Sequence, residues 1–148
     1  MKNERQQAAS AHERVMMNLS IFHLLLPVVA LSSNYISIVL AISLFGSIIM
    51  IFSVAKKARQ TTDVELVHTH WQVAWKRCRL LLISYAIATV IMLIGLLLAS
   101  LQSDSNMFSI MLIVVSRIAV VPVVLMVLAL FVMSTTSLSQ ARQGELPS

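Results

Sequence analysis

Long runs of apolar residues without a charged side chain dominate the pattern of this chain. The run between Arg14 and Lys56 has 41 residues and contains no Asp, Glu, Lys or Arg. One membrane-crossing helix needs about 20 apolar residues, each of which adds about 1.5 Å. The run is therefore long enough for two crossings, and its only polar cluster, Ser-Ser-Asn at 32–34, predicts the turn between them. We predict helices over 15–32 and 35–55.

The second half of the chain repeats this pattern. Residues 80–103 have no charged side chain and predict a third crossing at 80–101. The polar segment 102–106 then reverses the direction of the chain. A fourth apolar segment covers 107–133 and is interrupted by Arg117 and Pro122. The predicted fold is all-α, an integral membrane bundle of four transmembrane helices.

The flanking segments are polar, and the overall composition agrees with a membrane protein. Residues 1–14 are predicted to be a short solvated arm, and residues 134–148 a frayed tail rich in Ser, Thr and Gln. Hydrophobic residues make up 58% of the 148 residues and charged residues 11%, whereas soluble domains have about 45–50% and about 25%. A soluble domain is therefore nearly excluded.

Basic residues set the predicted orientation. Ten of them fall on one side of the four-crossing arrangement, in the first 14 residues, the loop 56–79 and the tail: Lys2, Arg5, Arg14, Lys56, Lys57, Arg59, Lys76, Arg77, Arg79 and Arg142. The positive-inside rule then places both termini and the middle loop in the cytoplasm, with the chain in the cytoplasmic (inner) membrane. The net charge of +5 indicates this topology and attraction to anionic lipids, and it does not favour nucleic acid as a partner.

The loop 56–79 contains an apolar stripe at helical spacing. Its members are Val64, Val67, Trp71, Ala74, Trp75 and Cys78. Acidic residues lie near its start and basic residues near its end, as the helix dipole favours. We predict an amphipathic interfacial helix over 63–79 that leads into the third crossing. Such a helix serves either as an anchor and topology signal or as a docking surface for another membrane subunit or anionic lipid headgroups.

Four residues of this segment are candidate contacts with a partner or with lipid. His68 and Gln72 are four positions apart and share a helix face, while Trp71 and Trp75 suit the membrane interface. A metal site is not expected, because His68 and His70 diverge on a helix and no acid or thiol completes a ligand set.

Arg117 is the only charged residue within a predicted crossing. Either it extends outward toward Asp104 or lipid headgroups, or it faces the bundle and pairs with hydroxyl or carbonyl groups. A substrate-binding role is a special case of the second alternative. None of the six acidic residues lies in a predicted crossing, which argues against a carrier coupled to protons or sodium.

Motifs for catalysis are missing from the sequence. It has no glycine-rich phosphate loop, zinc motif or nucleophile elbow, and Cys78 has cationic neighbours but no evident base. The sequence therefore predicts no enzyme activity, no metal and no cofactor.

The string His68-Thr69-His70-Trp71-Gln72 before the third crossing, together with Arg117 in the fourth, resembles a known family. These are the small bacterial four-helix membrane proteins related to the Tic-type component of the chloroplast inner-envelope translocon. In that family a His-x-x-aromatic-Gln pattern precedes the third helix and an Arg lies in the fourth. Here His68, Trp71, Gln72 and Arg117 occupy those places. The resemblance implies a four-helix fold with a cytoplasmic middle loop.

Two functional hypotheses follow. The first is a non-enzymatic accessory or scaffold subunit of a cytoplasmic-membrane complex, which docks through residues 63–79. The second is an autonomous oligomeric pore or transporter, or a holin-like protein that permeabilises the membrane. The partner is then another membrane subunit in the first case and a second copy of the chain in the other.

Overall fold

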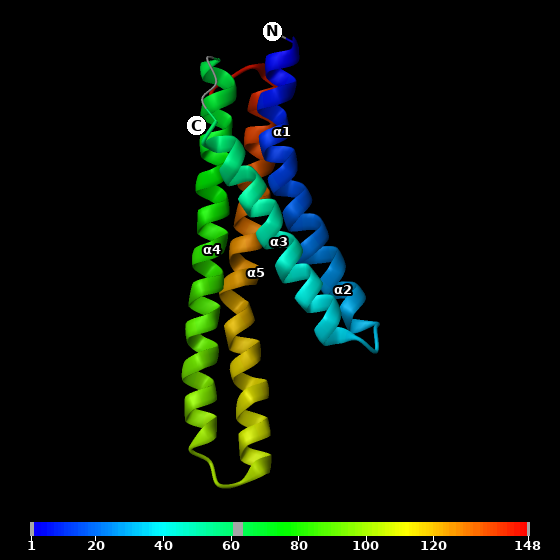
Figure 1. Ribbon diagram of the computed structural model, residues 1–148, viewed down its shortest axis with the longest axis vertical. Coiled ribbons are helices and arrows are strands. Elements are labelled where there is room, and N and C mark those ends of the chain that lie inside the picture. Colours follow the sequence, from blue (N-terminus) through cyan, green and yellow to red (C-terminus); the bar gives the residue numbers. More distant parts are fainter. Residues whose placement is uncertain (1, 61–63, 148) are drawn as a thin grey trace. The chain divides into compact units, whose positions relative to one another are not determined.

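A computed structural model describes residues 2–60 and 64–147, and the regular elements in them are helices. Within these residues, four helical stretches are long and apolar enough to cross a membrane: Lys2–Leu31, Ile36–Ala58, Glu65–Ser100 and Ser105–Gln143. The all-α prediction and the four candidate spans are confirmed. The elements in chain order are α1 (Lys2–Asn18), the π-helix η1 (Leu19–Leu25), α2 (Leu26–Leu31), α3 (Ile36–Ala58), α4 (Glu65–Ser100) and α5 (Ser105–Gln143) (Figure 1).

The helices divide between two compact units. Unit 1 comprises the residues up to Cys78 and those from Ala129 onward, and unit 2 comprises Arg79–Leu128. The first part of α4 and the last part of α5 therefore belong to unit 1, and the rest of these two long helices forms unit 2.

In unit 1 the chain runs through α1, η1 and α2 and returns through α3 alongside them (Figure 1). The connecting turn covers residues 32–35. Ser33 Oγ accepts a hydrogen bond from the Tyr35 N–H at 3.0 Å, and the Ser32 N–H donates to the Val29 carbonyl at 3.1 Å. The Ser33 hydroxyl and the Val29 carbonyl thus accept hydrogen bonds from backbone N–H groups where the helix ends. The predicted turn at 32–34 is confirmed.

The π-helix η1 lies directly before a proline and brings an aromatic ring against α3. Pro27 has no N–H to donate to the carbonyl four residues earlier, and wider π-turns accompany such interruptions of the helical hydrogen bonds. Within this segment the Phe22 ring occupies the space that a Cβ atom on Gly46 would need. Ser43 Oγ also donates a hydrogen bond to the Phe22 carbonyl. The absence of a side chain at Gly46 therefore allows η1 and α3 to pack closely.

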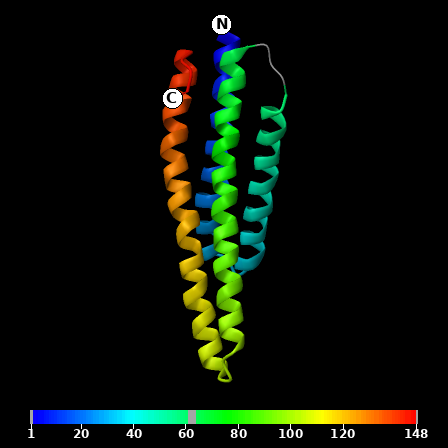
Figure 2. The same cartoon turned by 90° about the vertical axis from the view of Figure 1, so that its left-hand side faces the viewer.

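Unit 2 is a helical hairpin whose two arms run antiparallel, as the green and yellow ribbons of Figure 2 show. The inner face of α4 carries small side chains, including the buried Ser84 and Ala99. Between them Gly95 is in direct contact with Val115, which fills the place of its missing Cβ. Asp104 Oδ1 accepts a hydrogen bond from the Asn106 N–H at 2.8 Å and caps the start of α5. Small residues let the backbones approach, as is usual between membrane helices.

The structure shows no separate interfacial helix at 63–79. Residues 65–79 are the first part of α4, which continues without a break to Ser100. Asp63 lies outside the described residues. The predicted boundary rested on the change from charged to apolar residues at Arg79, and such a change in polarity does not end a helix when neither Pro nor Gly accompanies it.

Both flanking segments are more ordered than the sequence suggested. Residues 2–14 belong to α1, and Ala8, Ala11 and His12 in them are fully buried. Residues 134–143 continue α5, so the prediction of a frayed tail is wrong for them. Packing of these two segments within unit 1 stabilises helices that neither sequence would maintain in isolation.

Candidate functional site

Three helix segments of unit 1 meet near the end where both chain termini lie: α1, the start of α4 and the end of α5 (Figure 1). Ala8, Ala9 and Ala141 form a buried apolar cluster there, with Leu66 and Leu138 packed against it. Alanine side chains let the helices approach closely. This close approach brings polar side chains of the three segments within hydrogen-bond distance of one another.

Arg77 lies at the centre of this contact and is only 5% exposed. Its Nη2 atom donates a hydrogen bond to Ser137 Oγ of α5 at 2.6 Å, and its Nη1 atom lies 3.2 Å from His12 Nδ1 of α1. Its Nε atom is buried without a hydrogen-bond partner among the described residues. Together with His70, which joins next, these residues form what we call the Arg77 cluster: His12, His70, Arg77 and Ser137.

The hydrogen bonds of the Arg77 cluster determine the protonation of both histidines. A guanidinium group only donates, so His12 Nδ1 must accept from Arg77. His12 Nε2 then carries the proton and donates to His70 Nδ1, 2.8 Å away. His70 Nε2 in turn donates to the Glu145 carbonyl at 2.9 Å. Both rings are therefore neutral, and the three donors on this path point in one direction, from Arg77 Nη1 through His12 and His70 to the Glu145 carbonyl.

The Glu145 carbonyl reaches His70 because α5 ends in a Schellman motif. Gly144 adopts a φ of 83°, its N–H donates to the Ala141 carbonyl at 3.2 Å, and the Glu145 N–H donates to the Gln140 carbonyl at 3.0 Å. This pair of bonds defines the motif, and glycine adopts the positive φ without strain. The Arg5 side chain packs over Gly144, where a Cβ atom would lie. The turn thus directs the next carbonyl toward α4.

The chemistry of the Arg77 cluster is that of a connection between helices. Its hydrogen bonds join α1, α4 and α5, and its histidine rings, 83° apart in an edge-on contact, are fully buried. Within the described residues, no group of three or more His, Cys, Asp or Glu side chains is arranged to hold a metal ion. A buried hydrogen-bond network of this kind stabilises one particular arrangement of its helices.

The four predicted contact residues of α4 lie beside this cluster rather than in it. Gln72 Nε2 donates to the Ala58 carbonyl at 2.7 Å, so it caps the end of α3 within unit 1. Trp71 is buried, and the Arg14 guanidinium lies 5.4 Å from the centre of its ring. His68 and Trp75 are half-buried. Their predicted binding to an outside partner stays a prediction.

The predicted apolar stripe of this segment faces the interior of unit 1. Val67, Trp71, Ala74 and Cys78 are all buried in it. The stripe therefore packs against the chain itself, and the burial of these side chains does not require a membrane surface.

Arg117 lies in unit 2, on the outer face of the hairpin. It is exposed, whereas Ala119, which lies four positions after Val115 on the other side of α5, is buried. Residues three, four and seven positions to either side share its helix face, and six large apolar side chains there are 47–55% exposed. We call this surface the Arg117 face: Ile110, Ile113, Val114, Arg117, Val120, Val121 and Val124. Arg117 forms no ion pair or hydrogen bond with the described residues.

Sequence reasoning missed His12, Arg77 and Ser137 as members of a site. A signal exists in the spacing, since His70 and Arg77 are seven positions apart and fall on the face defined by the buried Val67 and Ala74. His12 similarly shares a face with Ala8, Val15 and Leu19. Polar residues that lie on the same helix face as a stripe of apolar residues are therefore candidates for burial.

No protein-family model, curated protein or solved structure matches this chain. The resemblance to small four-helix proteins related to the Tic-type translocon component therefore stays a prediction, based on His68, Trp71, Gln72 and Arg117.

Proposed function

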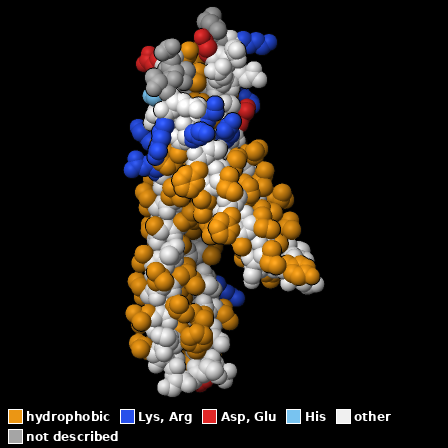
Figure 3. Space-filling model, viewed as in Figure 1, with side chains coloured by type: hydrophobic (Ala, Val, Ile, Leu, Met, Phe, Trp, Pro, Cys, Tyr) orange, Lys and Arg blue, Asp and Glu red, His pale blue; other side chains and the backbone are white. Residues whose placement is uncertain are grey.

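We propose that this chain is a non-enzymatic accessory or scaffold subunit of a membrane complex, and that it docks through the Arg117 face of its hairpin. The observation that carries this proposal is an exposed arginine, without a partner among the described residues, at the centre of an apolar helix surface. Figure 3 shows how hydrophobic side chains cover the visible side of the hairpin. A soluble protein does not expose such a surface, and a lipid-facing surface does not favour a charge.

The depth of Arg117 makes its charge costly. Gly95 contacts Val115, so Arg117 lies level with the region of Leu93 in the antiparallel arm. That position is seven residues, or about 10 Å, inside the end of α4 at Ser100. An arginine at the centre of a membrane helix costs about 2.5–3.5 kcal/mol on insertion scales, and less toward the ends. A partner that neutralises Arg117 offsets this cost.

The Arg77 cluster supports the scaffold part of the proposal. It uses polar side chains to fix α1, α4 and α5 within unit 1, and its histidines are fully buried. Its polar groups thus bind one another. A unit whose helices are held in a fixed arrangement is what a scaffold protein needs.

We place the chain in the inner membrane with both termini in the cytoplasm. The basic residues support this orientation, since most of the Lys and Arg side chains visible in Figure 3 gather toward the end of unit 1 that holds both termini. The positive-inside rule assigns that end to the cytoplasm.

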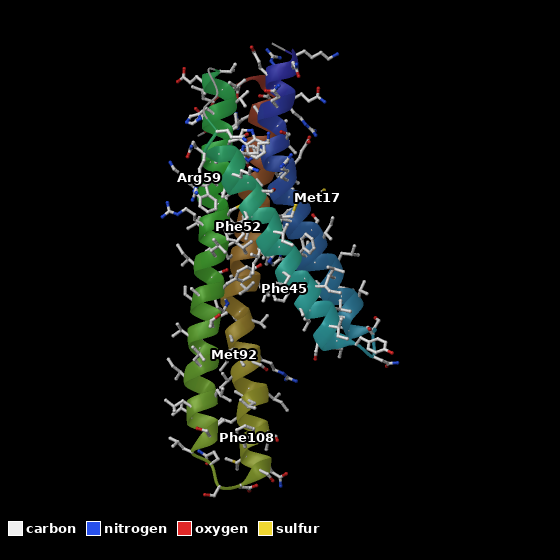
Figure 4. The ribbon with its side chains drawn as sticks, in the orientation of Figure 1. Met17, Phe45, Phe52, Arg59, Met92 and Phe108 are labelled. Atoms are coloured by element: carbon white, nitrogen blue, oxygen red, sulfur yellow. The ribbon has the colours of Figure 1, made fainter. Side chains whose placement is uncertain are left out.

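Capture of partners from native membranes tests the proposed function. The tagged full-length protein is crosslinked in its membrane, purified in mild detergent and analysed by mass spectrometry. We expect the parent chain to co-purify another membrane protein in stoichiometric amount. The control variant Arg59→Leu, which removes an exposed arginine at the end of α3 (Figure 4), is expected to retain this partner. Arg117→Leu is expected to lose the partner.

Two results would count against the subunit proposal. Recovery of the chain only as a defined oligomer of itself, with ion or solute flux that Arg117→Leu abolishes, would favour the autonomous pore or transporter. Retention of the same partner by Arg117→Leu would show that the Arg117 face is not the docking surface.

A further inference from the structure

We propose that the Arg117 face binds a membrane helix of another protein that carries an Asp or Glu side chain opposite Arg117. This inference rests on the proposed function and specifies the chemistry of the partner. It follows from the position of Arg117, from the places of the acidic residues of this chain, and from the apolar side chains around the guanidinium group.

Within unit 2, no acidic side chain reaches Arg117. Asp104 is the only one of the six in unit 2, and its Oδ1 atom accepts the hydrogen bond from the Asn106 N–H. It is 13 positions from Arg117 in sequence, which corresponds to about 20 Å along α5. The negative charge that Arg117 needs is therefore not supplied from within the hairpin.

A second copy of the chain does not supply it either. Copies inserted in the same orientation place equivalent residues at the same depth, so the Asp104 of a neighbouring copy lies level with Asp104 and not with Arg117. Such a dimer through the Arg117 face would also bring two guanidinium groups together in an apolar setting. Like charges repel there more strongly than in water.

The surroundings of Arg117 favour a carboxylate over a neutral acceptor. The hydroxyl of the preceding residue, Ser116, already donates to the Ile113 carbonyl at 2.8 Å and is neutral. A carboxylate accepts two parallel hydrogen bonds from a guanidinium group and neutralises its charge. The other members of the Arg117 face are Ile and Val, whose stiff side chains give a partner helix a dry, regular surface. Water is thereby kept from the ion pair.

Single-span model peptides test this chemistry directly. Three Leu/Ala peptides that differ only in a central Glu, Gln or Leu are added to phosphatidylcholine vesicles containing the full-length protein. The protein carries an acceptor dye on Lys57→Cys in a Cys78→Ser background, and association is measured by energy transfer. We expect the Glu peptide to bind about tenfold more tightly than the Gln or Leu peptide. We expect this preference to disappear in Arg117→Leu and to persist in Arg59→Leu.

The outcomes separate this inference from the proposed function. Equal binding of the three peptides to a folded parent protein would overturn the inference, even if a native partner had been captured. A preference for Glu that survives in Arg117→Leu would overturn it as well. Loss of the preference when phosphatidylglycerol replaces phosphatidylcholine would assign Arg117 to lipid headgroups instead. A preference for Glu without a captured native partner would support the carboxylate contact and leave the subunit proposal unsupported.

Discussion

His12 accepts a hydrogen bond from Arg77, a buried cation that forms no ion pair with the described residues. Replacement of His12 by alanine leaves the Nη1 atom of Arg77 without its acceptor and breaks the contact with His70. Hydrogen bonds to charged groups contribute about 1.5–3 kcal/mol. We expect His12→Ala to lower the free energy of unfolding by about that amount, measured by denaturant titration in detergent micelles.

The matched control for His12→Ala is His68→Ala. His68 is half-buried and lies outside the Arg77 cluster, so its replacement is expected to change the free energy of unfolding by less than about 0.5 kcal/mol. Equal effects of the two substitutions would contradict the assignment of His12 to a stabilising network.

Acidification acts on the same two rings. Because His12 Nδ1 and His70 Nδ1 both accept hydrogen bonds, a proton added to either atom places one N–H group against another. Histidine in an unfolded chain titrates near ~6.5, so protons favour the unfolded state below that value. The free energy of unfolding is expected to be constant above about pH 7.5 and to fall as the pH is lowered toward about 5.5.

The double variant His12→Asn and His70→Asn is the comparison for this pH dependence. It is expected to be less stable than the parent at neutral pH and to lose much of the slope between those two pH values. The remaining slope belongs to other titrating groups of the chain. An unchanged slope in the double variant would show that the cluster does not sense protons.

At the scale of single elements, the end of α5 offers a sharp test. Gly144→Ala places a Cβ atom at a φ of 83° and against the Arg5 side chain. A non-glycine residue in this left-handed conformation costs about 1–2 kcal/mol. We expect faster hydrogen exchange in the last turns of α5. We also expect a weaker hydrogen bond from His70 Nε2 to the Glu145 carbonyl. Gln143→Ala, an exposed neighbour, is expected to leave the exchange pattern unchanged.

The elements themselves were predictable, because helix length and charge-free runs are local properties. The turn at 32–34 and the reversal at 102–106 follow from short polar segments between long apolar ones. The continuity of α4 was not predicted, since a change from charged to apolar side chains marks a change in surroundings and not in backbone conformation. Helix ends depend on caps, and α4 has none near Arg79.

The Arg77 cluster was less predictable, because its members come from distant segments. His12 and His70 are 58 positions apart and Arg77 and Ser137 are 60 apart, so no local pattern joins them. Because charged side chains are usually exposed, Arg77 was interpreted only as one of the basic residues that determine the orientation in the membrane. Gln72 was expected to bind a partner, and its actual partner, the Ala58 carbonyl, is defined only by the fold.

At the scale of the whole molecule, the proposed orientation predicts which positions a membrane-impermeant thiol reagent reaches. In a Cys78→Ser background, Asn34→Cys and Asp104→Cys lie in the two short turns and Lys57→Cys at the opposite end of α3. We expect labelling of the first two in intact cells and of Lys57→Cys only after the membrane is opened. Labelling of Lys57→Cys in intact cells would contradict the proposed orientation and indicate the opposite one.

The burial of Arg77 also has a consequence for how the chain is made. Ser137 follows Arg77 by 60 residues, which a ribosome takes about 3–12 s to add. During that interval the guanidinium group has not yet met α5, and in the proposed orientation it would act as a cytoplasmic retention signal for the insertion machinery. Only later does it become an interior hydrogen-bond donor. Arg77→Lys should therefore preserve the insertion topology yet impair the finished protein, since one residue serves biosynthesis and the mature structure at different times.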